Sequence, residues 1–203
     1  MKKALLNYRT KTNRQSPQGK PKVFFTCHEK DFNSFFDTES KAVLWADENI
    51  DCAIWYNSDA YYYPTGDESK EEYYSLLYDM NLFVIPVTLN VLKGNNRAYD
   101  IDFRYALDHN ITLLMIMEEQ GLEDLFETMC GQLQYLDRYQ DRTTQDSYEN
   151  KLKKFLNDAL ISCELSEKIR AAFDAYIFLS YRKKDRKEAL KISSFYTGRD
   201  SKR

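Results

Sequence analysis

The chain has 203 residues, of which 43% are hydrophobic and 30% are charged, and its formal net charge is -3. This length fits one domain of ordinary size with some additional chain, and the hydrophobic content excludes a chain that is disordered throughout. Six glycines and four prolines exclude a collagen-like or low-complexity chain. The longest apolar runs, such as residues 111–117, are far shorter than the ~20 residues of a membrane span.

The charge is distributed unevenly along the chain. Residues 1–22 contain seven Lys or Arg and no acidic residue, and residues 182–203 contain nine basic and three acidic residues. The segment between them holds 13 basic and 29 acidic residues. Because an acidic body repels nucleic-acid phosphates, we expect no nucleic-acid partner and interpret residues 1–21 as a solvated basic tail.

The cysteines and histidines indicate which disulfide or metal sites are possible and which cellular compartment is expected. Cys27, Cys52, Cys130 and Cys163 form no C-x-x-C pair and the chain has two His, so we expect neither a disulfide framework nor a zinc site. The apolar run that starts at Ala4 is too short for a secretory signal peptide. We therefore expect a cytoplasmic protein in a reducing environment, without a membrane partner.

The first half of the chain alternates short apolar runs with helical patterns. Val23–Thr26 is typical of a buried strand, and Asp31 can cap a helix over 32–47 that follows it. A second strand is expected over 52–56. A polar loop then separates it from a short helix predicted over 71–79.

The second half continues the alternation. A third strand is predicted over 82–87, and because Pro86 cannot donate to a ladder, the strand should end or bulge there. The remaining pattern predicts, in chain order, a helix over 97–109, a strand over 111–117, a helix over 122–129, a strand over 133–136 and a helical stretch from 147. Apolar strands alternating with helices favour a flavodoxin-like, doubly wound α/β fold with a parallel sheet of about five strands.

Ligands of such sheets bind beyond the carboxyl ends of the strands, which directs attention to the residues there. Cys27 and His28 follow the first expected strand directly. His28 is interpreted as either a ligand contact or a loop residue. Cys27 is more typical of a small buried residue than of a nucleophile, because His28 is the only base near it in sequence. The three tyrosines at 61–63 suggest either an interaction surface or a loop folded onto the domain.

One segment of the chain is similar to another. Residues 177–185 repeat the pattern of residues 23–31 at a distance of 154 residues: an apolar strand, a small hydroxyl residue, a charged run and an Asp that can cap a helix. We interpret this as a tandem of related domains. The expected organisation is a first domain over 22–161, a helical linker over 162–173 and the truncated start of a second domain over 174–203.

The repeated segments carry a resemblance to a known family. Phe173–Tyr181 resembles the first sequence box of TIR (Toll/interleukin-1 receptor) domains, an acidic and aromatic entry into a buried strand that ends in Ser-Tyr. Residues 22–161 resemble the same family more loosely, with Cys27-His28 in place of Ser-Tyr or Ser-His. The other segments that carry the likeness are Ile54–Tyr56 (second strand), Pro64–Gly66 (BB loop), Phe83–Val87 (third strand) and Arg97–Ala106 (third helix). The tandem is similar to bacterial TIR proteins, many of which act in defence against phage.

The resemblance implies a site and a reaction. Many TIR domains cleave NAD⁺ at the nicotinamide–ribose bond with a Glu on the third helix, and Asp102 occupies that position here. A carboxylate is needed to stabilise an oxocarbenium-like ribose. Asp is one methylene shorter, and a misplacement of about 1 Å can reduce the rate about a hundredfold. The implied substrate-binding residues are Cys27, His28, Trp55, Tyr56, Pro64 and Gly66; NAD⁺ would be a substrate, and no cofactor is implied.

Three functional hypotheses remain open from the sequence. The first is a TIR-like domain that signals by self-association and is degenerate in catalysis. The second is an NAD⁺-consuming enzyme that uses Asp102, and the third is a module that senses a nucleotide without chemistry. Structural alternatives stand beside them: Asp102 as a solvated helix residue near Arg97, and Trp55 and Tyr56 as core residues rather than stacking platforms.

Overall fold

The computed structural model describes residues 5–12, 15–138 and 147–161, and the chain divides into two units, Met1–Glu164 and Leu165–Arg203. All of the described residues belong to the first unit. The expected linker over 162–173 and the expected start of a second domain over 174–203 lie outside the described residues.

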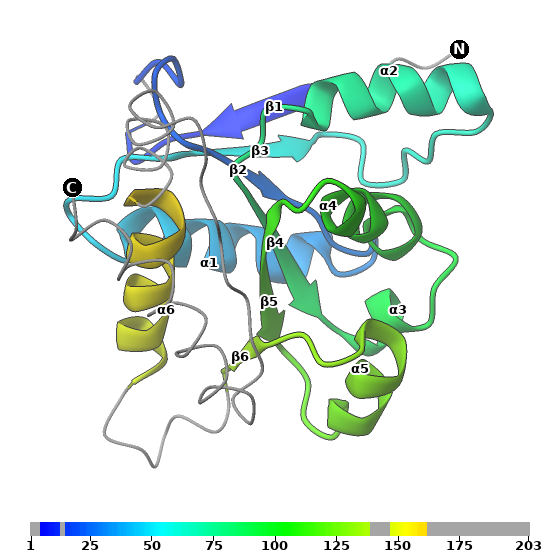
Figure 1. Ribbon diagram of the computed structural model, residues 1–203. Helices are drawn as coiled ribbons and strands as arrows, with labels where there is room; N and C mark the ends of the chain where they lie inside the picture. The colour runs from blue at the N-terminus through cyan, green and yellow to red at the C-terminus, as the bar shows by residue number, and fades with distance from the viewer. Residues whose placement is uncertain (1–4, 13–14, 139–146, 162–203) are drawn as a thin grey trace, which may run out of the picture. The chain divides into compact units, whose positions relative to one another are not determined.

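A six-stranded sheet forms the centre of the first unit, in the order β1-β3-β2-β4-β5-β6 (Figure 1). The strands are β1 (Leu6–Arg9), β2 (Lys22–Phe25), β3 (Ala53–Asn57), β4 (Leu82–Val87), β5 (Thr112–Met117) and β6 (Tyr135–Asp137). Strands β2 to β6 pair in parallel, and β1 is antiparallel to β3. The parallel strands follow the flavodoxin-like order, which confirms the predicted fold class.

Strand β1 differs from the expectation of a tail over residues 1–21. Leu6 pairs with Asn57 and Arg9 pairs with Ile54, so this segment adds a sixth strand at the edge of the sheet. The Tyr8 ring lies 5.3 Å from the Trp55 ring. The pairing satisfies the edge of β3, which would otherwise present unpaired backbone groups. Four residues with a weak apolar pattern gave no sequence signal for this strand.

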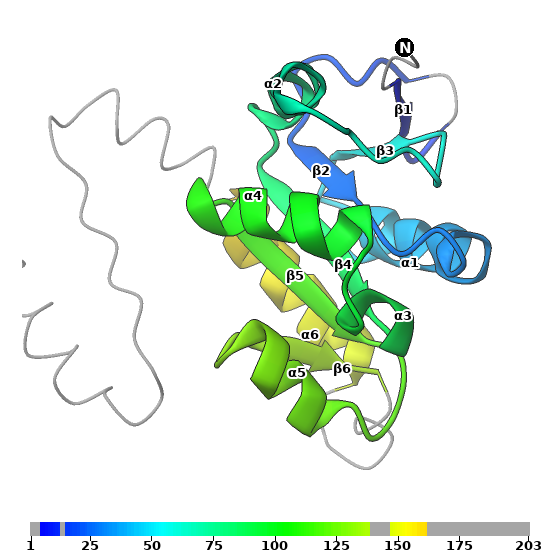
Figure 2. The same cartoon turned by 90° about the vertical axis from the view of Figure 1, so that its right-hand side faces the viewer.

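Helices cover both faces of the sheet, as a doubly wound fold requires. They are α1 (Phe32–Trp45), α2 (Asp67–Leu77), α3 (Leu89–Leu92), η1 (Ala98–Phe103), α4 (Arg104–Asp108), α5 (Glu123–Cys130), α6 (Tyr148–Leu156) and η3 (Asn157–Ile161). Helices α4 and α5 lie in front of the strands in Figure 2 and α6 lies behind them. The expected helix over 97–109 consists of a π-helical stretch, η1, that continues into α4. The expected helix over 71–79 begins earlier, at Asp67, directly after Gly66.

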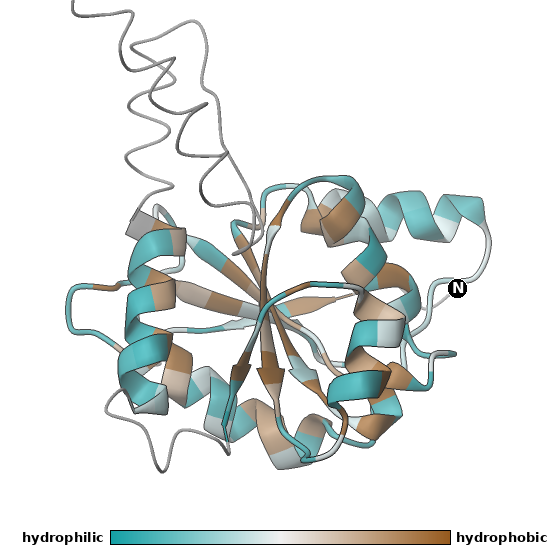
Figure 3. Cartoon of the chain, turned by 60° about the horizontal axis from the view of Figure 1, so that its bottom comes forward, coloured by the Kyte–Doolittle hydropathy of each residue, from teal (hydrophilic) through white to brown (hydrophobic). Residues whose placement is uncertain are grey.

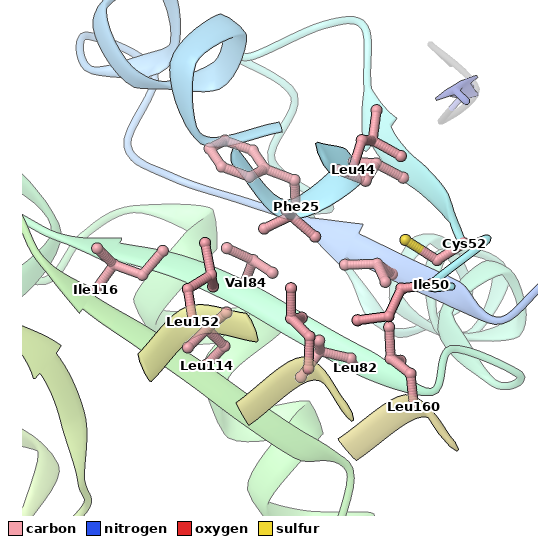
Figure 4. Close-up of a cluster of buried hydrophobic side chains, with 14 of the residues drawn as sticks. Phe25, Leu44, Ile50, Cys52, Leu82, Val84, Leu114, Ile116, Leu152 and Leu160 are labelled. Atoms are coloured by element: carbon pink, nitrogen blue, oxygen red, sulfur yellow. The ribbon is translucent and has the colours of Figure 1, made fainter. Parts of the chain in front are cut away.

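The core is divided by the sheet into a layer on each face. On one face, side chains of the strands pack against α1 and α6, as Figure 4 shows for Phe25, Val84, Leu114 and Leu152. On the other face, the strands pack against the remaining helices. Every residue of β4 is buried, and the central strands are the most hydrophobic elements in Figure 3. This burial explains the continuous apolar run that the sequence shows there.

Pro86 does not end or bulge β4, contrary to the expectation. It pairs in register with Ile116, and the strand continues to Val87. The carbonyl of Val84 accepts from the amide of Thr26 at 3.1 Å, so the backbone polar groups of Val84 point toward β2. The backbone nitrogen of Pro86, two residues further along the strand, points the same way, but the ladder between β2 and β4 ends at Val84. The missing amide hydrogen therefore faces a position where no partner strand needs it.

Candidate functional site

The carboxyl ends of β2 and β4 meet at the point where the strand order reverses, the usual ligand-binding region of this fold. Asp31 lies there, and its carboxylate accepts hydrogen bonds from Oγ1 of Thr88 at 2.6 Å and Nδ2 of Asn90 at 2.7 Å. Asp31 is the residue before α1, but its side chain makes no capping hydrogen bond. The expectation that it caps the helix is thus corrected: the carboxylate ties the loop after β2 to the loop after β4.

Asp102 lies in the π-helical stretch η1 and is completely buried. Its carboxylate accepts hydrogen bonds from Oγ1 of Thr26 at 2.5 Å, from the hydroxyl of Tyr73 at 2.8 Å and from Nε of Arg97 at 3.3 Å. Burial raises the pKa of Asp102, while these three donors act in the opposite direction. The alternative of a solvated helix residue is therefore wrong. In this arrangement the carboxylate would have to be uncovered before it could contact a substrate.

Arg97 extends this network to the loop that follows β3. One guanidinium nitrogen donates to the backbone carbonyls of Asp59 and Tyr62, at 3.2 and 2.9 Å. The guanidinium thus connects a buried carboxylate with two loop carbonyls. We call Asp102, Arg97, Thr26 and Tyr73 the Asp102 network. Its contacts determine the position of the loop relative to the sheet.

The loop of residues 57–66 divides its aromatic side chains between the core and the surface. Tyr62 packs with its ring centre 5.7 Å from that of Tyr73, whereas Tyr61 is 76% exposed. Tyr63 is also exposed. Tyr62 thus fits the interpretation of a loop folded onto the domain, and the interaction surface stays a prediction for the exposed Tyr61 and Tyr63. Pro64 and its neighbours line a small hollow of about 310 Å³.

Cys27 and His28 take different positions at the end of β2. The side chain of Cys27 is buried, and this burial, with a further contribution from Asp31, raises the pKa of the thiol far above its usual range. Because the thiolate is the nucleophile, the structural interpretation of Cys27 is favoured. The Nδ1 atom of His28 accepts from the amide of Lys30 at 3.1 Å, and its Nε2 atom lies 3.5 Å from the carboxylate of Glu29.

Trp55 and Tyr56 pack on opposite faces of the sheet, because successive strand residues alternate. Trp55 packs against Tyr8, and the ammonium of Lys22 lies 5.7 Å from its ring centre. Tyr56 packs against Phe36, with ring centres 4.3 Å apart. The two aromatics therefore cannot line one pocket together, and both contribute to packing. The structure therefore brings only some of the site residues predicted from the sequence together at one edge of the sheet.

A second polar cluster was missed from the sequence. Glu39 of α1 is completely buried, and it accepts from the hydroxyl of Tyr148 at 3.0 Å and from Arg138. Arg138 also donates to Glu118, at 2.9 Å. Burial and the nearby Glu39 raise the pKa of Glu118 to about 7. The helical spacing that places Phe32, Glu39 and Val43 on one face was the available signal. We call Glu39, Glu118, Arg138 and Tyr148 the Glu118 cluster.

Two tests for familiar kinds of site are negative within the described residues. There, no group of three or more His, Cys, Asp or Glu side chains could hold a metal ion. None of the helices in that part of the chain has the length and apolar character that crossing a bilayer would require. Comparison of the sequence with models of known protein families and with curated proteins finds no match.

Proposed function

We propose that the first unit is a cytoplasmic, TIR-like signalling domain of a bacterial protein, that it acts by self-association, and that it does not use Asp102 as a catalyst. The TIR resemblance rests on the segments described above. The observation that carries the proposal is the Asp102 network. The network keeps Asp102, the carboxylate that matches the family's catalytic position, buried. It also fixes a loop with exposed tyrosines.

The first step concerns catalysis. Cleavage of a ribosyl bond needs a carboxylate that contacts the sugar. Asp102 could do so only after losing its contacts with Thr26, Tyr73 and Arg97. Separating a buried ion pair costs about 3–5 kcal/mol, because each charge is left without a partner. The closed network therefore favours a structural role for Asp102 over NAD⁺ hydrolysis.

The second step concerns the surface. Tyr61 and Tyr63 are exposed on a loop whose backbone is held by Arg97. Aromatic side chains are enriched in protein interfaces, and a loop that is already ordered loses less conformational entropy on binding. The loop occupies the position of the family's BB loop by resemblance. A second copy of the domain is the partner that a self-associating signalling module requires.

The proposal is tested by measuring mass against concentration, using light scattering after size exclusion or sedimentation. Wild type should form dimers or larger species as concentration rises, and the double variant Tyr61→Ser/Tyr63→Ser should shift this transition to about tenfold higher concentration. Tyr78→Ser is the matched control, because Tyr78 is 80% exposed at the end of α2. A protein that stays monomeric at all concentrations would contradict the proposal.

Enzyme activity is tested separately. Purified protein is incubated with NAD⁺, and the release of nicotinamide is followed by chromatography. We expect no release by wild type or by Asp102→Glu. Release that is lost in Asp102→Asn, while circular dichroism shows that the variant remains folded, would instead establish the hydrolase alternative. A rise in melting temperature with NAD⁺ or ADP-ribose, without release, would support the sensing alternative.

A further inference from the structure

A cavity of about 790 Å³ lies between α1 and α6, beside the Glu118 cluster. Its volume is within the range of about 300–1,000 Å³ that is typical of small-molecule sites. Helix α1 contributes Phe35 and Trp45 to the wall, and α6 contributes Glu149 and Leu152. The cavity thus has apolar sides and a charged end, and none of the residues of the Asp102 network line it.

Among the residues that the structure describes, a single guanidinium contacts the two carboxylates at the charged end of the cavity. Arg138 donates to both Glu39 and Glu118, so one guanidinium serves two carboxylates. Arg138 reaches both oxygens of Glu118, at 2.9 and 3.2 Å, whereas Glu39 has the hydroxyl of Tyr148 as a second donor. Glu149, on the first turn of α6, adds a further negative charge to the lining. A positive group placed beside Glu118 would be attracted by these carboxylates.

The apolar part of the cavity complements such a group. The ring of Trp45 is on the lining and is 63% exposed, although large aromatic side chains are usually covered. An aromatic face attracts cations and stacks on flat groups. Phe35 and Leu152 provide further apolar surface on the two helices.

We propose that this cavity binds a small organic cation, whose ammonium group contacts the Glu118 carboxylate and whose apolar body lies among Phe35, Trp45 and Leu152. An ammonium group has three donors and one positive charge, and both complement the paired carboxylates of Glu118 and Glu39. A neutral molecule of the same shape would fill the cavity without supplying them, and an anion would be repelled by Glu118 and Glu149.

Binding of this kind is coupled to the ionisation of Glu118. The pKa of Glu118 is raised to about 7, chiefly by burial and then by Glu39, while Arg138 acts against them. A cation binds the ionised form, so a bound ammonium displaces the proton from Glu118. Affinity should therefore rise with pH up to about 7, by at most about tenfold per pH unit, and should level off above it.

The test uses 2-phenylethylamine as the probe and 2-phenylethanol as its neutral counterpart, titrated into the full chain by calorimetry at about pH 5.5 and about pH 8. The amine should bind at least about tenfold more tightly than the alcohol at the higher pH, and less tightly at the lower pH. Glu118→Gln should reduce the affinity for the amine about tenfold and remove its pH dependence. Glu71→Gln, which replaces an exposed carboxylate on α2, should change neither the affinity for the amine nor its pH dependence.

A second variant keeps the test valid if Glu118→Gln fails to fold, which circular dichroism reports. Trp45→Ala removes an exposed side chain and should weaken amine binding several-fold while the fold is retained. Equal affinity for amine and alcohol would overturn the proposal. So would an amine affinity that is unchanged by Trp45→Ala and Glu118→Gln, or an absence of amine binding at both pH values.

Discussion

The Nε atom of Arg97 lies 3.3 Å from Oδ2 of Asp102, and the two side chains are 6% and 0% exposed. This ion pair is enclosed by protein and satisfied by further donors and acceptors on both sides. It joins η1 to the end of β2 and to the loop after β3. Asp102, which matches the family's catalytic position by resemblance, thus has the contacts of a structural connection.

Replacing Asp102 should destabilise the domain strongly. Asp102→Ala leaves the Arg97 guanidinium buried without its carboxylate and removes acceptors from Thr26 and Tyr73, so the free energy of unfolding should fall by about 3–5 kcal/mol. Urea denaturation followed by fluorescence measures this. Asp108→Ala, an exposed aspartate on α4, should change it by less than about 0.5 kcal/mol. Equal stability of the two variants would contradict the account of the network.

Gly66 should not tolerate a side chain. Its backbone has φ 85° and ψ 157°, a conformation that is essentially restricted to glycine, and it immediately precedes α2. A Cβ atom would meet no other atom within 4 Å, so the expected loss of about 1–3 kcal/mol in Gly66→Ala is due to the backbone alone. Chemical denaturation checks this, with Thr65→Ala as the neighbouring control. A loss in the control as large as in Gly66→Ala would refute the backbone explanation.

Cys27 should be inert toward alkylation in the folded protein. Burial raises the pKa of its thiol, and burial likewise raises the pKa of Cys52 to about 11. Iodoacetamide reacts with the thiolate, so peptides containing either cysteine should remain unmodified at neutral pH until urea is added. Mass spectrometry of the digested protein gives the extent of modification. Rapid labelling of Cys27 without denaturant would restore it as a candidate nucleophile.

Glu118 should make stability depend on pH. Its pKa is about 7 in the folded protein against 4.5 for an unperturbed Glu, so the folded state holds the proton more tightly than the unfolded state. The free energy of unfolding should therefore fall as pH rises from 4.5 to about 7, and Glu118→Gln should remove this contribution. The variant should gain on the order of 1 kcal/mol relative to wild type above pH 7.

This prediction is checked by urea denaturation at several pH values. Glu127→Gln, an exposed carboxylate on α5, is the matched control and should follow the wild-type pH profile. If wild type and Glu118→Gln keep a constant difference across this range, Glu118 does not titrate as its surroundings indicate.

The sequence predicted the parallel α/β architecture because that signal is local. A buried strand such as β4 needs apolar residues at every position, and this requirement is visible as a continuous run. The polar loop expected over 57–69 does follow a carboxyl end, that of β3, but it ends at Gly66 because α2 begins at Asp67. Strand β1 was missed, since its pairing with β3 depends on a partner more than 40 positions away rather than on its own four residues.

The chemistry at the site was decided by tertiary structure. From sequence, Asp102 could be a catalyst or a solvated residue, and only the approach of Thr26, Tyr73 and Arg97 shows that it is buried and satisfied. Glu39 and Glu118 are 79 positions apart and meet at Arg138. The apolar periodicity of the sequence shows which residues become buried on folding, and this pattern can be read from the sequence alone. Which polar groups meet inside, and how that shifts their proton affinities, depends on distances that only the folded chain defines.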